Sequence, residues 1–480
     1  MRGAGRVAVR VVAVGMGCLA ASAAWAVPIT GFTKAVAGAP TQAQQNDVAD
    51  AGDLNLDGRT DLVLGDPSAP AGGVANAGMA WVSLGGAGGG LLPNYATVMG
   101  MLPGDQLGAA VDGVGDFNCD GRQDLAVGAP GFDGTGIDSG AVFVFYGPLA
   151  PGPHPAMTAN LVVFGEGPGD AFGKSVQLLK DVDMDGCSDL IVGAPNRTNP
   201  GFGNTGAAYV IMSTTYAGGG VLPALPGPAL RIDGAAAGSN FGWAVDTAGD
   251  FDGDGQLDVV IGSPTLQASG AAFVFYRPGP TWLAGLTPVP AIPFSTVWFG
   301  EPGGAAAGWS VDGGSDLNFD GRSEVLIGAP RAMGMAAFGD GAVYMVSAST
   351  VPIGPGVAHA MPGGGAKFAG IAPGGALGWD VSFGYDVNMD GRPDWMAGAP
   401  FAVIGGGQGQ TYFRAGTGVV PPAGTIVPIS PPSLNIDSVA ATRIVGFSLD
   451  GSLDNDMDGR PDPLIGAYHQ ASLRNFLSSW

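Results

Sequence analysis

The sequence predicts an all-β protein, a seven-bladed β-propeller of four-stranded blades. An acidic segment recurs seven times, short apolar runs between Gly and Pro turns fill each interval, and the two chain ends resemble complementary parts of one blade. The 480 residues include 87 Gly and 38 Pro, but 46% are hydrophobic, which is enough for a buried core. Turn-rich β structure is therefore favoured over disorder.

The acidic segment is exemplified by GDFNCDGRQDLAVGAP at 115–130, where oxygen-bearing side chains precede an apolar run and a Gly-Ala-Pro stop. Its copies begin 63–70 residues apart, a regularity typical of repeat architectures. The first acidic residues of the seven copies are Asp53, Asp116, Asp181, Asp250, Asp316, Asp386 and Asp454.

Each period contains four strand-like segments. In the third period a Gly-containing run (171–176) precedes the acidic loop, and an apolar run after the loop ends in Gly-Ala-Pro. An aromatic-rich run such as 140–147 and a further apolar run such as 160–167 supply the other two segments. Four short strands separated by Gly/Pro turns are typical of a propeller blade.

The chain ends predict how the ring closes. The last repeat stops after a third strand-like segment at 472–480, and VPITGF at 27–32 resembles an isolated fourth strand. We expect this N-terminal strand to pair with the C-terminal strands, which hides sheet edges. Residues 27–480 then form one domain, and an open solenoid is the alternative.

Residues 1–26 are predicted to be a cleaved signal peptide. Arg2, Arg6 and Arg10 precede an apolar run, and Ala24-Trp25-Ala26 provides a small-x-small cleavage site. An uncleaved anchor, or lipidation at Cys18, is the alternative. No later apolar run reaches 18 residues, so no membrane insertion is expected. The protein is expected to be secreted, extracellular or periplasmic.

The loop pattern D-x-[DN]-x-D-G-x-x-[DE] predicts metal binding. Oxygen ligands at positions 1, 3 and 5, a turn-forming Gly at 6, a backbone carbonyl at 7 and a carboxylate at 9 suit Ca²⁺, with up to seven ions. The alternative is that Asp, Asn and Gly only make turns. The predicted ligands are Asp53, Asn55, Asp57, Arg59 and Asp61; Asp116, Asn118, Asp120, Arg122 and Asp124; Asp181, Asp183, Asp185, Cys187 and Asp189; Asp250, Asp252, Asp254, Gln256 and Asp258; Asp316, Asn318, Asp320, Arg322 and Glu324; Asp386, Asn388, Asp390, Arg392 and Asp394; and Asp454, Asp456, Asp458, Arg460 and Asp462.

The net charge of −22 argues against nucleic acid as a partner. The seven loops hold 24 of the 41 acidic residues, so metal sites account for most of this acidity. Two cysteines, Cys119 and Cys187, occupy loop positions 4 and 7 of adjacent repeats. A disulfide between them is not expected, because their Cα atoms would have to lie within about 7 Å.

The repeats resemble the FG-GAP repeat of the integrin α-subunit propeller. Phe172-Gly173 and Phe241-Gly242 match its first half, Gly-Ala-Pro at 128–130 and 193–195 matches its second, and the first repeat lacks Phe-Gly. The resemblance implies a seven-bladed propeller with Ca²⁺ in the loops between first and second strands. It also implies ligand binding on the opposite face, which here would include the loops at 131–139, 196–205 and 331–340.

The sequence leaves three functions open. The first is a secreted adhesion or ligand-binding module for an extracellular protein or glycan. The second is a structural surface or matrix protein without a discrete ligand. The third is a propeller hydrolase or lyase, but His154, His359 and His469 lie in unrelated segments without a catalytic motif, so no catalytic residue is predicted.

Overall fold

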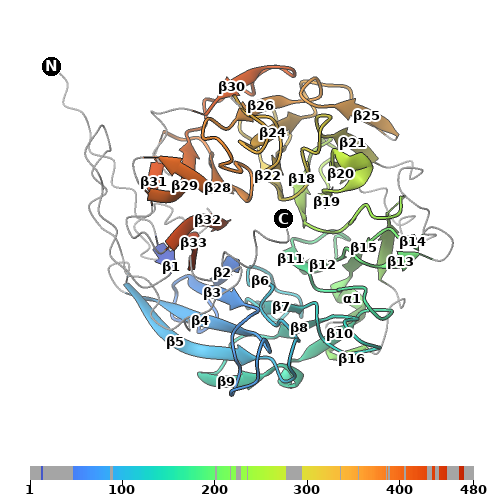
Figure 1. The fold of residues 1–480 in the computed structure, drawn as a ribbon. Helices are drawn as coiled ribbons and strands as arrows, with labels where there is room; N and C mark the ends of the chain where they lie inside the picture. The colour runs from blue at the N-terminus through green and yellow to red at the C-terminus, as the bar shows by residue number, and fades with distance from the viewer. Residues whose placement is uncertain are drawn as a thin grey trace.

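The computed structural model places six sheets as blades around a central cavity (Figure 1). Within each blade, the first strand lies nearest the centre and consecutive strands pair antiparallel. The structure describes residues 12–14, 47–86, 90–199, 203–216, 218–222, 229–234, 236–276, 295–335, 337–354, 356–384, 386, 390–404, 407–429, 435–437, 443–450 and 464–469.

The blades follow one another along the chain. Each contains four antiparallel strands in the predicted order. From the first blade to the sixth, these strands are β2 (Asp47–Gly52), β3 (Asp61–Asp66), β4 (Met79–Gly86) and β5 (Gly90–Met99); β6 (Ala110–Asp112), β7 (Leu125–Ala129), β8 (Ala141–Phe145) and β10 (Leu161–Phe164); β11 (Ser175–Leu179), β12 (Asp189–Ala194), β15 (Ala207–Ile211) and β17 (Leu230–Asp233); β18 (Val245–Gly249), β19 (Asp258–Ser263), β20 (Ala271–Phe275) and β21 (Ser295–Phe299); β22 (Val311–Ser315), β23 (Glu324–Ala329), β24 (Ala342–Ser347) and β26 (Ala366–Ala369); and β27 (Val381–Gly384), β28 (Asp394–Ile404), β29 (Gly407–Arg414) and β31 (Asn435–Asp437).

Four blades gain a fifth strand that the sequence did not predict. In each case, a later segment of the chain reaches back and pairs in parallel with the outermost strand of an earlier blade, on the rim of the ring (Figure 1). These parallel pairings link successive repeats by backbone hydrogen bonds. The added strands are β9 (Gly152–Pro155), β16 (Gly220–Leu222), β25 (Val357–Ala360) and β30 (Ile426–Pro428).

The prediction of seven four-stranded blades is wrong, because the structure has six blades. The seventh repeat contributes β32 (Arg443–Asp450) and β33 (Leu464–His469) to a three-stranded sheet with β1 (Val12–Val14). An acidic loop marks only the connection between the first two strands of a repeat, so counting loops overcounted the blades.

The three-stranded sheet occupies the interval between the sixth and first blades, since β32 lies beside both β27 and β2. β1 pairs in parallel with β33 and falls within the predicted signal peptide, whose cleavage stays a prediction. The closing strand predicted at 27–32 and the strand predicted at 472–480 lie outside the described residues.

The remaining elements are short. None of the helices in the described ranges is long and apolar enough to cross a membrane. These short elements are the hairpin strands β13 (Thr198–Asn199) and β14 (Gly203–Asn204), the helix α1 (Ser213–Tyr216), and the 3₁₀ turns at Ala156–Thr158 and Leu266–Ala268.

The core lies between neighbouring blades rather than in one central mass. One cluster joins side chains of the first two blades, including Val63 and Phe143, and another joins the second and third blades through Phe117 and Leu190. Strands such as β7 are buried at every residue, because each blade is covered on both faces. This explains why the second strand of each repeat is a continuous apolar run rather than an alternating one.

Pairs of glycines allow adjacent blades to approach closely. Gly173 has φ +87°, a left-handed conformation that favours glycine, and its carbonyl oxygen lies against Gly128 of the preceding blade. A Cβ built on Gly128 would lie only 2.1 Å from that oxygen. The same contact recurs where Gly242 meets Gly193. The Phe-Gly of one repeat and the Gly-Ala-Pro of the previous one are therefore two sides of one backbone contact.

We expect Gly128→Ala to destabilise the protein by about 3 kcal/mol, because the new methyl group meets backbone that cannot move without separating two blades. Gly218→Ala is the matched control, since a Cβ there meets no atom within 4 Å. Thermal unfolding followed by circular dichroism should show a midpoint several degrees lower for the first variant only. Equal midpoints for the two variants would contradict this explanation of the repeat.

Candidate metal centres

The acidic loops connect the first and second strands at one end of each blade. The structure describes the first five loops completely and the sixth in part, without Asn388. The seventh loop, from Asp454 to Asp462, lies outside the described residues. The glycine at position 6 has a positive φ, for example +82° at Gly58, which turns the chain back toward the position 1 carboxylate.

The position 1 carboxylate organises each described loop by accepting backbone hydrogen bonds. In the first loop, Asp53 Oδ1 accepts from the N–H of Asp57 at 2.9 Å, and Oδ2 accepts from the N–H of Gly58 at 2.8 Å. Asn55 Oδ1 also accepts from the N–H of Asp57, at 2.8 Å. Asp116, Asp181, Asp316 and Asp386 make the same pair of bonds in their loops, and Asp250 makes a similar pair.

The position 9 carboxylate is buried and attaches the loop to the blade. Asp189 Oδ2 accepts from the N–H of Val182 within the loop, and Oδ1 accepts from the N–H of Ser213, which follows the third strand; both bonds are 2.9 Å. Asp61 bonds in the same way to Leu54 and Gly85, each at 3.0 Å. Position 9 therefore joins loop, second strand and third strand.

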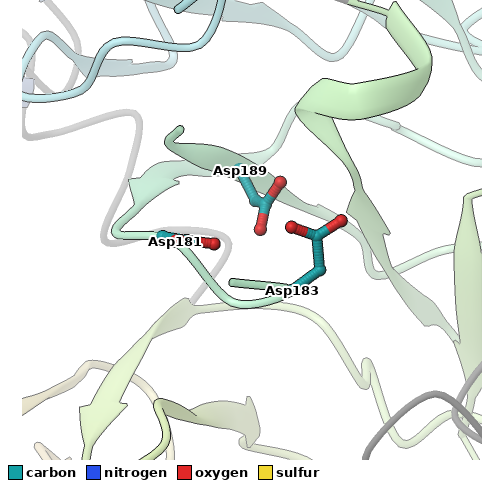
Figure 2. A group of neighbouring side chains, drawn as sticks. All are labelled: Asp181, Asp183 and Asp189. Carbon is teal, nitrogen blue, oxygen red and sulfur yellow. The ribbon is translucent and has the colours of Figure 1, made fainter. Parts of the chain in front are cut away.

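In two loops, the carboxylates converge closely enough to hold one ion. One ligand oxygen from each of Asp181, Asp183 and Asp189 lies within 4.8 Å of the others, and Figure 2 shows the three carboxylates facing one another. Asp250, Asp252 and Asp254, at positions 1, 3 and 5 of the next loop, form a second such group. In the other described loops, the predicted ligands occupy the same hydrogen-bonded turn.

Burial shifts the pKa of the position 9 carboxyls upward. Desolvation is the main cause, and neighbouring loop carboxylates add to it. The pKa is raised to about 7 for Asp61 and Glu324 and to about 6 for Asp124 and Asp189. A bound divalent cation would favour the ionised form of these groups, because it would offset both the burial and the repulsion.

The donor set fits a hard cation. Side-chain oxygens from positions 1, 3, 5 and 9 would supply the ligands, without a thiolate or imidazole, which matches the preference of Ca²⁺. At position 7, the N–H groups of Arg59 and Cys187 donate to the position 5 carboxylates at 3.0 and 2.8 Å. Ligation by the position 7 carbonyls stays a prediction.

The two cysteines form a disulfide, contrary to the sequence-based expectation. Cys119 at position 4 of the second loop is bonded to Cys187 at position 7 of the third, with their Cα atoms 5.3 Å apart. Side-by-side stacking of the blades brings these residues together despite a separation of 68 residues. Gly253 and Arg322 show the same offset, because a Cβ on Gly253 would lie 2.8 Å from Arg322 Nε.

Comparison with known proteins places these loops in a known repeat. The FG-GAP repeat family matches four segments, each covering the first three strands and the loop of one blade. Integrin alpha-7 from Homo sapiens is 33% identical over 251 residues, 51% of this chain and 18% of that protein. The matched segments are 108–145, 172–211, 241–275 and 307–345.

The chain contains four FG-GAP repeats within a β-propeller that is similar to integrin alpha subunits. Integrin alpha-PS2 from Drosophila melanogaster is 28% identical over 242 residues, 49% of this chain and 16% of that protein. Phosphatidylinositol-glycan-specific phospholipase D from Bos taurus is 35% identical over 160 residues, 32% of this chain and 18% of that protein. The chain thus spans less than a fifth of each relative, and the similarity includes both an enzyme and integrin subunits.

The FG-GAP propeller also has a ring of inward carboxylates that the sequence analysis missed. Asp112 Oδ2 accepts from the N–H of Leu178 in the next blade at 2.5 Å, and Asp312 Oδ2 accepts from the N–H of Phe383 in the next blade at 2.5 Å. Asp450 Oδ2 accepts from the N–H of Asp50 at 2.5 Å, linking β32 to the first blade. These aspartates lie four residues before an acidic loop, a spacing that could have revealed them.

The carboxylates around the central cavity are strongly desolvated. Burial raises the pKa of Asp112 to about 7, although its hydrogen bond from Leu178 acts in the opposite direction. Asp246 and Asp312 interact with each other from adjacent blades. Burial together with their mutual repulsion raises the pKa of Asp246 well above its usual value. Asp112, Asp246 and Asp312 therefore favour the protonated form at pH values where exposed aspartates are ionised.

We expect the chelated propeller to lose stability as the pH rises from about 4 to about 7. Folding raises these carboxyl pKa values, so the stabilisation is complete below about pH 4 and is lost as the pH rises through the folded values of about 6 to 7. Thermal midpoints measured in EDTA at several pH values test this.

Asp112→Asn should weaken the pH dependence, because asparagine keeps an acceptor for Leu178 but does not titrate. Asp133→Asn, which changes an exposed carboxylate, is the control. A midpoint that increases with pH in the chelated parent protein would contradict the assignment.

Proposed function

We propose that this protein is an exported, Ca²⁺-binding propeller that acts as an adhesion or ligand-binding module for an extracellular protein or glycan. The observation that carries the metal assignment is the convergence of Asp181, Asp183 and Asp189 in a loop pattern repeated along the whole chain. The similarity to integrin alpha subunits supports a binding role. Residues 1–26 would direct export.

The cations would act on structure rather than on chemistry. A Ca²⁺ ion bound to positions 1, 3, 5, 7 and 9 would neutralise carboxylates that otherwise repel one another across a few ångströms. Because position 9 also bonds to the end of the third strand, each ion would stabilise three connected segments of its blade. Up to seven loops would act in this way.

A binding role is favoured over catalysis by the surroundings of two histidines. His154 and His359 each lie in an added outer strand, with Nε2 at 2.7 Å from the carbonyl oxygen of Ala150 and 2.8 Å from that of Pro352, respectively. Both positions lie on the rim, away from the residues that line the central cavity. These rings thus have structural partners.

The ligand-binding face would lie opposite the metal loops, at the connections between second and third strands. The described part of this face includes 131–139, 331–335 and 337–340. It exposes Ile137 (73%) and Phe338 (58%), large apolar side chains that a partner surface could cover. Different sequences on neighbouring blades would give this face its selectivity.

We expect chelation to lower the thermal midpoint sharply and added Ca²⁺ to restore it, whereas Mg²⁺ should restore it less because it prefers fewer protein ligands. Asp181→Asn should weaken Ca²⁺ binding measured by calorimetry, and Asp138→Asn, an exposed residue outside the loops, should not. An unchanged midpoint after EDTA treatment would exclude the metal role.

A binding screen tests the adhesion role. Purified protein with Ca²⁺ should bind a defined set of extracellular proteins, glycans or cell surfaces, and EDTA should reduce that binding because the loops hold the blades in place. Ile137→Ser, on the proposed ligand face, should reduce binding, while Leu56→Ser, on the metal-loop face, serves as the matched exposed control. Ca²⁺-dependent self-assembly without ligand binding would instead favour a structural matrix protein.

A further inference from the structure

The centre of the propeller contains a cavity of about 550 Å³ lined by the first strands of the blades. This volume lies within the range of small-molecule sites, roughly 300–1,000 Å³. The aspartates described above line its walls, and three tryptophans and Lys174 line it as well. No role in metal binding or ring closure accounts for the tryptophans.

The tryptophans form a continuous arc built by three consecutive blades. Trp243, Trp309 and Trp379 each precede the first strand of their blade by two residues, so the repeat places them at equivalent positions. The ring centroid of Trp309 lies 5.0 Å from that of Trp243 and 5.0 Å from that of Trp379. Phe401 packs edge-on against Trp379 at 5.3 Å and fixes that end of the arc.

Two members of the arc remain partly accessible. Trp243 and Trp309 are half-buried, while Trp379 is 4% exposed. Trp243 precedes β18 and the metal ligand Asp250 follows it, so a five-residue strand of about 16 Å separates the arc from the metal loop. The arc therefore lies at the end of the cavity opposite the acidic loops.

Polar groups lie next to the aromatic rings. Asp246 and Asp312 are the second residues of β18 and β22, three positions after Trp243 and Trp309, and both line the cavity. Protonated carboxyls can donate as well as accept hydrogen bonds. Lys174 Nζ lies 5.2 Å from the ring centroid of Trp243 and provides a further donor.

We propose that this tryptophan-lined cavity binds a sugar unit of a neutral glycan. The apolar C–H face of a sugar ring would pack on Trp243 and Trp309, and its hydroxyl groups would bond to Asp246, Asp312 and Lys174. An organic cation is the competing ligand, because seven aspartates and two lysines line the same cavity, and the test below includes one. This inference rests on the proposed binding function and names one ligand class for it.

The test uses the full-length Ca²⁺-loaded protein, an array of neutral oligosaccharides, and titration of the best-binding sugar followed by tryptophan fluorescence. We expect saturable binding with a change in emission, because a sugar on the arc replaces water at the indole rings. Trp309→Ala should reduce the affinity about ten-fold or more, and Trp309→Phe should recover part of it. If Trp309→Ala does not fold, Trp243→Ala takes its place.

Ile426→Ala is the control, since it shortens an exposed apolar side chain of the outer strand β30, outside the cavity lining and away from the proposed ligand face. Retained binding in Ile426→Ala together with loss in Trp309→Ala supports the site. No sugar binding at millimolar concentration, equal affinity of Trp309→Ala and the parent protein, or binding of spermidine instead of sugars would overturn it. Glycan binding lost in Phe338→Ala but kept in Trp309→Ala would overturn the cavity site while leaving the proposed adhesion function in place.

Discussion

The close backbone contact between adjacent blades is the constraint on which the rest of the fold depends. The carbonyl oxygen of Gly173 occupies the space that a side chain on Gly128 would fill, and the same arrangement recurs between Gly242 and Gly193. Because the blades can approach this closely, apolar side chains on their faces interlock across each boundary. The core of this protein is therefore a series of interfaces, and its stability depends on each blade being held at a fixed distance from the next.

Because the blades stack at a fixed distance, side chains at the same position of successive repeats lie side by side around the ring. Carboxylates of the acidic loops gather at one end of the blades, and the aspartates four residues earlier gather around the cavity. Residues seven positions before the loop, such as Trp243 and Trp309, gather at the other end. A single repeat thus supplies three sets of side chains, each at a different level along the blade. The inner aspartates join blades through bonds such as Asp112 to Leu178, so they combine ring closure with a polar cavity wall.

Much of this organisation could be predicted from the sequence, since it depends on local patterns. The order of the four strands, the place of the acidic loops and the importance of the glycines all follow from one repeat. The number of blades could not be obtained in this way, because the acidic loop marks only two strands of a repeat. The fifth strands were also missed. β9 has the sequence GPHP, and its extended form depends on the edge of the previous blade rather than on its own composition.

The disulfide shows why contacts between blades are difficult to infer from one copy of the repeat. Cys119 and Cys187 occupy different loop positions, so a comparison of equivalent positions does not pair them. In the folded ring, however, position 4 of one loop lies beside position 7 of the next, as the approach of Gly253 to Arg322 also shows. Adjacent acidic loops contact each other directly, and the Cys119–Cys187 bond makes one of these contacts covalent.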